Sequence, residues 1–467
     1  MSNFNIQTPK GAFYMTVITI FGSTGDLMYN KLIPALNTLK QTNKLPSDTK
    51  ILCVGRREWD TLTYLKSVKN EVPKDKYNAI ESLIEYVKVS IDSDDGYALL
   101  KSKIEQNGIE ADKIFYLALP PSLFPKVAGG LSKNKLIGKG EPNARIVFEK
   151  PFGEDLESAR LINRTLWDYF EETQIYRIDH YLGKEMIQNI LTLRFANRIF
   201  ESDWNKDSID KVSIIVKEKN GIDSRGNYYD SIGALRDMVQ SHLLQMLALV
   251  AMEAPKMYDS ELIRKEKVSL LKKLFVECGD VFNAQYKGYK QEPKVRDDSK
   301  TETFVHIKAQ IDDSRWRDVP FYLMTGKKLN DKSSEIIIDF KPGDDVLALW
   351  PDHTLKHNQL VVKVAPNEGV SFRMNVKQAG LSSDIIPSKM DYSHGKDAFG
   401  NVPEAYEKLL LEIIEQNTLL FTRWDEIETT WKFIDKVTNE CQEAPYEYED
   451  EPDLIQAMKE RGIDYDS

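Results

Sequence analysis

Hydrophobic residues follow one pattern in the first part of the chain and another in the rest. The first part contains short runs of β-branched and other apolar residues that end at glycine, proline or charged residues. These runs are Thr16–Phe21, Ile51–Val54, Ile114–Leu119 and Arg145–Phe148. They alternate with stretches whose apolar residues recur at helical spacing, which is typical of a parallel sheet covered by helices. We therefore expect an α/β domain built on a doubly wound parallel sheet.

Later segments alternate apolar and polar residues, as antiparallel strands with one solvated face do. They are 209–218, 302–312, 335–341 and 359–376, with helical blocks near 232–253, 260–275 and 403–416. Strands and helices that are segregated in this way predict an α+β domain with a large, mainly antiparallel sheet. We place an N-terminal extension at 1–14, the α/β domain at 15–179 and the α+β domain at 180–467.

Composition narrows the class of protein. The 467 residues are 41% hydrophobic and carry a net charge of −10, and residues 440–467 hold ten acidic but only two basic side chains. This is a globular composition whose acidity gathers in a C-terminal tail and argues against a nucleic-acid partner. The most apolar stretch, Leu243–Met252, is too short to span a membrane, so we expect no membrane partner.

The cysteines and the N-terminus bear on the compartment. Cys53, Cys278 and Cys441 are far apart, odd in number and form no CxxC pair. Residues 1–14 lack the basic-then-apolar pattern of a signal peptide. We therefore expect a cytoplasmic protein with reduced cysteines, no disulfide framework and no thiolate metal site.

A glycine turn suggests a nucleotide site. Gly22-x-x-Gly25 lies between the first strand and a helix, where backbone N–H groups can hold a pyrophosphate, although such a turn also occurs for packing alone. Arg56 follows the second strand, where an acidic residue would select the 2′-hydroxyl of NAD and an arginine the 2′-phosphate of NADP. A surface arginine is the plain alternative, but this position favours a Rossmann-type domain that prefers NADP.

His242 is a candidate general base. It lies on the apolar stripe of the helix expected over 230–253, where a histidine is usually a core residue but can accept a proton if a carboxylate orients it. Asp237 precedes it by five positions, roughly 140° round a helix, and cannot be that partner directly. The orienting acid must therefore come from elsewhere in the fold.

Two further clusters are ambiguous from spacing alone. His180, Tyr181 and Lys184 could converge on an anion, but they fit a solvated loop better. His353 and His357 have the i, i+4 spacing of a metal pair beside Asp352, but neither an HExxH glutamate nor a third clustered ligand accompanies them. We expect no metal.

Taken together, eight segments in order resemble the glucose-6-phosphate dehydrogenase family from about Thr16 to Val437. The most specific is RIDHYLGKE at 177–185. The others are GSTGDLMYNKL (22–32), YLALPPSLF (116–124), FEKPFGEDL (148–156), RFANRIFESDWN (194–205), YYDSIGALRDMVQSHLLQ (228–245), RWRDVPFYLMTGKKL (315–329) and PEAYEKLLLE (403–412).

The resemblance implies a role for each matched residue. His242 would be the general base and Asp179 the carboxylate that orients it. The residues implied to bind the sugar phosphate are His180, Tyr181, Lys184, Glu218, Asp237, Lys327 and Lys332, and Lys150 would lie between sugar and nicotinamide, before a cis peptide to Pro151. The residues implied to bind the coenzyme are Gly22, Ser23, Thr24, Gly25, Asp26, Leu27, Lys31, Arg56, Lys150 and, from a weaker alignment, Ser90 and Ile91.

The implied reaction is oxidation of glucose 6-phosphate at C1 to the lactone by NADP, with NAD as a possible second coenzyme, at the start of the oxidative pentose phosphate pathway. The resemblance also implies a homodimer or homotetramer. Two alternatives stay open: a related dehydrogenase of another sugar, and a non-catalytic protein that binds a sugar phosphate or NADP. Retention of His242 and Asp179 argues against the second.

Overall fold

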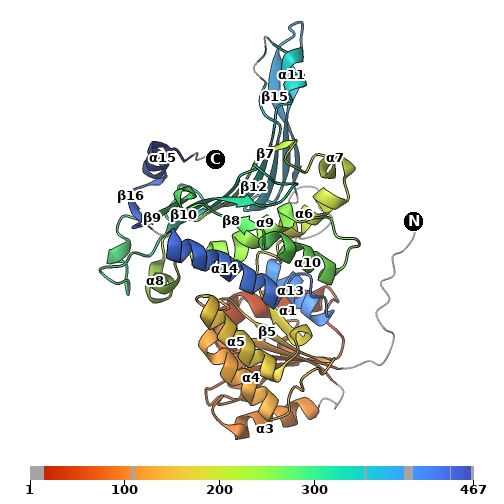
Figure 1. Cartoon of the computed structure of the whole chain (residues 1–467). Helices are drawn as coiled ribbons and strands as arrows, with labels where there is room; N and C mark the ends of the chain where they lie inside the picture. The colour runs from red at the N-terminus through yellow and green to blue at the C-terminus, as the bar shows by residue number, and fades with distance from the viewer. Residues whose placement is uncertain are drawn as a thin grey trace, which may run out of the picture. The chain divides into compact units, whose positions relative to one another are not determined.

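The computed structural model describes residues 15–106, 111–351, 353, 355–393, 403–441 and 443–463 (Figure 1). The chain forms two compact units. Unit 1 comprises the described residues of Met1–Phe152, Leu161–Ile178 and Tyr406–Thr418. Unit 2 comprises those of Gly153–Arg160, Asp179–Ala405 and Leu419–Ser467.

The sheet of unit 1 has six strands, all parallel, in the order β3-β2-β1-β4-β5-β6. The strands are β1 (Thr16–Phe21), β2 (Thr49–Gly55), β3 (Ile84–Lys88), β4 (Asp112–Leu117), β5 (Ala144–Phe148) and β6 (Ile175–Arg177). Every residue of β1 is buried, as expected for a strand covered on both faces. The predicted doubly wound α/β fold is confirmed.

Helices connect these strands. They are a π-helical turn (Met28–Leu32), α1 (Ile33–Gln41), α2 (Thr61–Glu71), α3 (Asp94–Glu105), α4 (Phe124–Lys133) and α5 (Leu156–Tyr169), and α13 (Ala405–Ile414) joins them from late in the chain. Crossover helices are what a parallel sheet requires, since its strands cannot be joined by tight hairpins.

Unit 2 contains a ten-stranded sheet in the order β15-β14-β13-β12-β7-β11-β10-β9-β16, with β8 paired to β10. Its strands are β7 (Ile209–Lys217), β8 (Leu274–Phe275), β9 (Val281–Tyr286), β10 (Phe304–Ile311), β11 (Phe321–Gly326), β12 (Ser333–Phe340), β13 (Gln359–Ala365), β14 (Gly369–Lys377), β15 (Ile385–Ser393) and β16 (Tyr446–Tyr448). Neighbours are antiparallel except β7 with β11 and β9 with β16. The predicted mainly antiparallel sheet is therefore confirmed.

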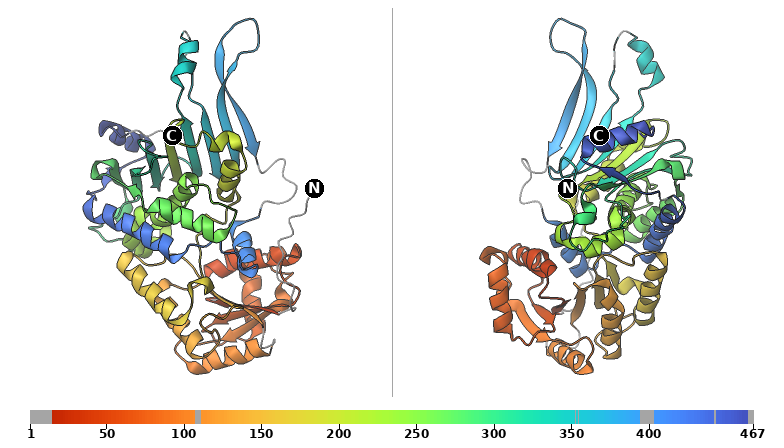
Figure 2. Two further views of the ribbon diagram at one scale, coloured as in Figure 1. Left: turned by 45° about the vertical axis from the view of Figure 1, so that its right-hand side comes forward. Right: turned by 90° about the vertical axis from the view of Figure 1, so that its left-hand side faces the viewer.

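One expected strand is divided. The segment 359–376 forms β13 and β14, which pair antiparallel across a turn that starts at the cis Ala365–Pro366 peptide. Figure 2 shows β14 and β15 as a long two-stranded ribbon that projects beyond most helices of unit 2, with α11 (Asp344–Leu349) at the same end. Most of β15 is exposed.

The helices of unit 2 are α6 (Glu185–Phe195), α7 (Arg198–Glu201), α8 (Gly226–Ala234), a π-helical segment (Leu235–Leu243, called the π-helix below), α9 (Leu244–Ala251), α10 (Ser260–Leu271), α11 (Asp344–Leu349), α14 (Trp424–Glu440) and α15 (Glu451–Glu460). The single helix expected over 230–253 is thus wrong: it is interrupted at Gly233, whose φ of 72° is not helical. A Cβ at Gly233 would lie 2.4 Å from Glu302 Oε1, so the kink requires glycine.

The apolar stretch Leu243–Met252 is the core of unit 2. All eight residues of α9 are buried, and the indole N–H groups of Trp204 and Trp316 donate to the carbonyl oxygens of Val250 and Ala251 at its end. These donors satisfy terminal carbonyls that would otherwise be buried without a partner. In the portion of the chain that the structure describes, no helix has both the length and the apolarity needed to cross a membrane.

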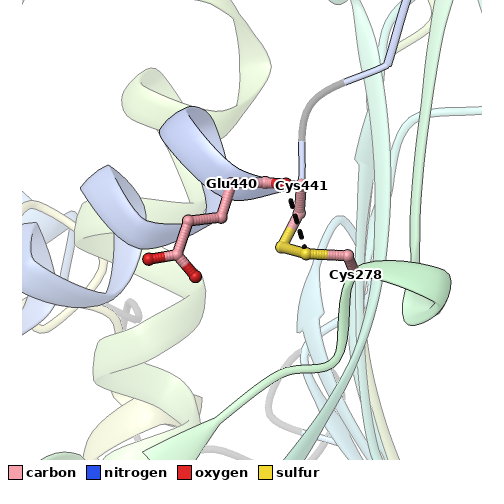
Figure 3. Close-up of a disulfide and its surroundings, with 3 residues drawn as sticks. All are labelled: Cys278, Glu440 and Cys441. Atoms are coloured by element: carbon pink, nitrogen blue, oxygen red, sulfur yellow. Dashed lines mark hydrogen bonds between the residues drawn. A yellow bond between two sulfur atoms is a disulfide. The ribbon is translucent and has the colours of Figure 1, made fainter.

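The expectation that no disulfide forms is wrong. Cys278 and Cys441 are joined by a disulfide in unit 2 (Figure 3), while Cys53 is unpaired and buried. Separation of 163 residues along the chain concealed this pairing, because sequence spacing does not reveal which distant residues the fold brings together.

Candidate active site

His242 and Asp179 form a buried pair in unit 2. His242 lies on the π-helix, and its Nδ1 is 2.5 Å from Asp179 Oδ1. The two side chains are 0% and 3% exposed. The N–H of Tyr181 also donates to Asp179 Oδ1, at 2.9 Å. The fold thus supplies the distant carboxylate that the helical position of His242 required.

The charge state of Asp179 follows from its neighbours. Burial acts to raise its pKa, but the nearby imidazoles of His242 and His180, together with the hydrogen bonds to His242 and the Tyr181 N–H, outweigh burial and lower the pKa to about 2. Asp179 is therefore an ionised acceptor at neutral pH. An ionised acceptor fixes the N–H proton of His242 on Nδ1, which makes Nε2 the basic nitrogen.

His180, Tyr181 and Lys184 surround this pair. The ring of Tyr181 stacks on His242 with 4.3 Å between centroids, and the ring of His180 meets His242 edge-on at 4.6 Å. Lys184 Nζ lies 4.7 Å from the centre of the Tyr181 ring. The structure therefore brings these predicted residues together beside His242. This arrangement differs from the solvated loop that their spacing alone favoured.

Acidic side chains act on Tyr181. Burial, followed by the charges of Glu218 and Asp179 and more weakly Asp237, raises the pKa of Tyr181 above its ordinary value. Asp237 also accepts a hydrogen bond of 3.5 Å from the hydroxyl of Tyr228. Glu218 and Asp237 thus share one environment with the dyad, as the resemblance implied.

Lys327 is a buried cation at the edge of this environment. Its side chain is 3% exposed, forms an ion pair with Glu218 and lies with Nζ 4.9 Å from the centre of the Tyr229 ring. The N–H of Glu218 donates to the carbonyl oxygen of Gly326 at 2.9 Å, which ties the ends of β7 and β11 together. Lys332 is exposed and lies five residues later in the turn before β12.

The predicted coenzyme residues lie in unit 1, at the carboxyl ends of its strands. Gly22–Leu27 follow β1. Gly22 has a φ of 78°, and a Cβ added to it would lie 2.1 Å from the Ala118 carbonyl oxygen, so this position requires glycine. Ser23 fastens the turn, since both its N–H and its hydroxyl donate to the Val54 carbonyl oxygen. Parallel sheets bind nucleotides at this edge, where the strand order reverses between β1 and β4.

Exposed cations complete the edge. Arg56 follows β2 and makes no ion pair with any residue that the structure describes, whereas Arg57 lies 4.5 Å over the ring of Trp59. Lys31 and Ser90 are exposed and Ile91 is half-buried, while Lys150 follows β5 and precedes a cis peptide to Pro151, as expected. The glycine turn and Arg56 suit an anionic dinucleotide with an additional phosphate.

Asp179, His180 and His242 could also hold a cation. Each offers a ligand atom, and these atoms lie within 4.8 Å of one another. His353 and His357 do not join such a group in the described part of the chain, and Asp352 lies outside the described residues. The absence of a metal cofactor stays a prediction.

Sequence reasoning missed part of the site. Tyr229, under Lys327, lies within a matched motif and could have been considered, because a buried tyrosine beside a lysine favours a cation–π contact. Glu149, next to Lys150, accepts hydrogen bonds from the hydroxyls of Tyr116 and Tyr406, and burial raises its pKa. Tyr406 lies in the matched motif at 403–412, but its contact with Glu149, 257 residues away in the chain, could not be seen from spacing.

Known proteins identify the family. The family model described as "Glucose-6-phosphate dehydrogenase, NAD binding domain" matches residues 19–189, and that described as "Glucose-6-phosphate dehydrogenase, C-terminal domain" matches residues 191–462. The glucose-6-phosphate 1-dehydrogenase of Chlamydia pneumoniae is 38% identical over 91% of this chain and 89% of its own length, and that of Bacillus subtilis is 37% identical over 92% of each.

A solved structure gives the same result. Glucose-6-phosphate dehydrogenase "in complex with its substrate glucose-6-phosphate" is 34% identical and superposes with a TM-score of 0.88 over 97% of this chain and 99% of that one. Both units, the order of the motifs and these similarities agree: the chain belongs to the glucose-6-phosphate dehydrogenase family and is an oxidoreductase.

Proposed function

We propose that this chain oxidises glucose 6-phosphate at C1 to 6-phosphoglucono-1,5-lactone and reduces NADP. The observation that carries the proposal is the buried Asp179–His242 pair with basic and acidic side chains grouped around it. In the family, a solved relative is described with glucose 6-phosphate as its substrate. The oxidative pentose phosphate pathway begins with this reaction, and we place the chain there.

His242 acts as the general base. C1 of the pyranose carries a hydroxyl, and His242 Nε2 accepts the hydroxyl proton as the C1–H bond breaks and the carbonyl of the lactone forms. Asp179 holds Nδ1–H in position and stabilises the imidazolium that results. General base catalysis of this kind contributes about 10²–10⁴ to the rate.

The phosphate and the hydroxyls of the sugar orient C1. His180, Tyr181, Lys184 and Lys332 bind the phosphate, while Glu218 and Asp237 accept hydrogen bonds from sugar hydroxyls. Lys327, held by Glu218 in the absence of substrate, contributes a charge that is already desolvated. Binding energy from the phosphate, which does not react, can thus be used to fix the reacting geometry.

The coenzyme, when bound, accepts the hydride from C1 on its nicotinamide ring. Residues of the Gly22–Leu27 turn would hold the pyrophosphate through backbone N–H groups, and Arg56 would bind the 2′-phosphate. Lys31, Lys150, Ser90 and Ile91 are further contacts. Arg56 is exposed after β2, at the position where an acidic residue would favour a free 2′-hydroxyl, and it makes no ion pair with the described residues. For this reason we propose NADP as the preferred coenzyme and NAD as the second.

The chain assembles as a homodimer or homotetramer. The support for assembly is the edge strand β15, where Ile386, Met390 and Tyr392 are 39%, 56% and 56% exposed. Apolar side chains on a sheet edge favour pairing with another copy, because an uncovered edge is otherwise prone to non-specific association.

Initial rates with matched substrates test the proposal. We expect turnover with glucose 6-phosphate and NADP, much lower kcat/KM with unphosphorylated glucose, and higher KM with NAD. Arg56→Ala should raise the KM for NADP much more than that for NAD. Equal rates with glucose and its phosphate would refute the phosphate site, and an equal effect of Arg56→Ala on both coenzymes would refute the role of Arg56.

A further inference from the structure

The C-terminal segment Tyr446–Glu460, composed of β16 and α15, contacts the turn that carries Lys327. Tyr448 is fully buried, and its hydroxyl donates to the Lys327 carbonyl oxygen at 2.5 Å. The same hydroxyl lies 3.3 Å from Thr303 Oγ1, and the N–H of Lys327 donates to the Thr303 carbonyl oxygen. The backbone of Lys327 is therefore held from two sides, one of which is the C-terminal segment.

Glu451 holds the same turn at a second point. Its side chain is 4% exposed; Oε1 pairs with Lys217 Nζ at 2.8 Å and Oε2 accepts the N–H of Asn330 at 2.9 Å. The turn between β11 and β12 is thus anchored at Lys327 and at Asn330. An acidic residue that composition assigned to a tail is part of the support of the site.

The disulfide anchors the chain five residues before this segment begins. Cys441 caps the end of α14, and Cys278 lies just before β9, the strand with which β16 pairs in parallel. Figure 3 shows the bond between these two backbones, beside Glu440. β16 has three residues, so the covalent bond restrains a strand whose own ladder is short.

We propose that the C-terminal segment, anchored by the Cys278–Cys441 disulfide, positions Lys327 for the sugar phosphate, with Tyr448 as the positioning residue. The proposal rests on the substrate-binding role of Lys327 given above. Tyr448 does not touch the substrate: it fixes the backbone from which the Lys327 side chain extends toward Glu218 and Tyr229. Loss of this restraint lets the ammonium group leave its desolvated position, which weakens sugar-phosphate binding.

The anchor can be opened chemically. A dithiol reductant supplies two electrons and two protons. One of its thiolates attacks the sulfur of Cys278, an exposed residue, to form a mixed disulfide, and Cys441, which is 5% exposed, leaves as the thiolate. The second thiol of the reductant then attacks the mixed disulfide, which releases Cys278 and closes the oxidised reductant. The products are two cysteine thiols and the oxidised reductant. Reduction keeps the side chains of Tyr448 and Glu451 but removes a restraint on the segment that carries them. We therefore expect reduction to raise the KM for glucose 6-phosphate, by less than removal of the Tyr448 hydroxyl does.

Tyr448→Phe tests the positioning role. Removing one hydrogen bond should raise the KM for glucose 6-phosphate about 3- to 10-fold, with kcat and the KM for NADP little changed. The matched control is Tyr446→Phe on the same strand, whose hydroxyl donates to Asp453 and not to the turn. A merely structural role would lower the melting temperature without this split, so an unchanged KM, or an equal rise in the control, would overturn the proposal.

Lys327→Ala separates this proposal from the function on which it rests. We expect this variant to raise the KM for glucose 6-phosphate and to abolish the further effect of Tyr448→Phe in the double variant. If Lys327→Ala leaves the KM unchanged, both the role of Lys327 and the proposal fail. If it raises the KM but Tyr448→Phe still adds its full effect, only the positioning proposal fails.

The disulfide is tested on the full-length wild-type chain. Alkylation after unfolding should trap one thiol, Cys53, in the oxidised protein and three after dithiothreitol. Reduction should raise the KM for glucose 6-phosphate, and Cys278→Ser should raise it permanently and remove the response, whereas Cys53→Ser should keep the response. Three thiols in the oxidised protein, or the same KM in both states, would overturn the role of the disulfide.

Discussion

At the scale of single residues, catalysis by His242 depends on its pairing with Asp179. Asp179→Asn should lower kcat by at least about 100-fold, because an amide neither fixes the tautomer nor stabilises the imidazolium. The KM for NADP should change little, since Asp179 is not among the predicted coenzyme contacts. Steady-state rates measure both effects. A kcat within a few-fold of wild type would mean that His242 does not need this partner.

His306 predicts a pH dependence of stability that is independent of catalysis. It lies on β10, is 2% exposed, and burial lowers its pKa from 6.5 to about 4. Because the unfolded chain binds the proton more readily, the contribution of His306 is complete above pH 6.5 and is lost as pH falls through 4. Its size is about 3 kcal/mol.

We therefore expect the melting temperature to fall between pH 7 and pH 4 more steeply in the wild type than in His306→Leu. Thermal unfolding followed by circular dichroism at several pH values measures this. The exposed His357→Gln serves as the control. Parallel curves for wild type and His306→Leu would contradict the assignment.

Some residue contacts could be predicted from sequence and others could not. The apolar stripe of the helix showed that His242 faces inward and that Asp237 is not its direct partner, which are consequences of local geometry. Asp179, 63 residues earlier in the chain, came from the family resemblance alone. The contacts of Tyr448 and Glu451 with the turn after β11 were not predicted, because acidic composition does not reveal which side chains of a segment face a sheet.

At the scale of elements, the glycine turn after β1 offers a test of the coenzyme site. Gly22→Ala would place a methyl group 2.1 Å from the Ala118 carbonyl oxygen at a φ of 78°, and the positive φ alone costs about 1–2 kcal/mol. The turn should shift, and its N–H groups should then bind the pyrophosphate less well. We expect coenzyme affinity to fall at least about 10-fold, which corresponds to a loss of about 1.4 kcal/mol of binding free energy.

Equilibrium titration of the protein with NADP measures this loss. Gly138→Ala in the same unit is the control, because its added Cβ meets only Glu141, at 3.5 Å. We expect the control to bind NADP as the wild type does. Unchanged affinity in Gly22→Ala would show that the coenzyme does not bind at this turn.

Elements with a strong local signal were the ones predicted. The four expected strands of unit 1 are continuous apolar runs because both faces are covered. β3 and β6 were missed, since β3 places Glu85 and Lys88 among its apolar residues and β6 has only three residues. The break at Gly233 was missed because a single glycine in a periodic stretch does not reveal that Glu302 occupies the space of its side chain.

At the scale of the whole molecule, exposed apolar residues on β15 predict assembly. Met390→Lys combined with Tyr392→Lys should lower the molar mass in solution toward that of one chain, because two charges on the strand oppose burial against another copy. Light scattering after size exclusion measures the mass. An oligomer of unchanged mass would place the interface elsewhere, and a monomeric wild type would refute the proposed assembly.

Net charge and the positions of single charges give different information about the whole molecule. The net charge of −10 bears only on the class of partner, since it is a sum over the chain. The buried ion pair of Glu451 with Lys217 shows that part of the C-terminal acidity is neutralised inside unit 2. The position of a charged residue in the folded chain decides whether it is solvated or supports the site, and composition does not give this position.

The central claim is that His242 removes the C1-hydroxyl proton during oxidation of glucose 6-phosphate. The most direct measurement is the rate of NADPH formation by His242→Asn at saturating substrates, with glucose 6-phosphate affinity measured by calorimetry on the same protein. We expect turnover to fall at least about 100-fold while affinity is largely retained. Turnover close to that of the wild type would contradict it.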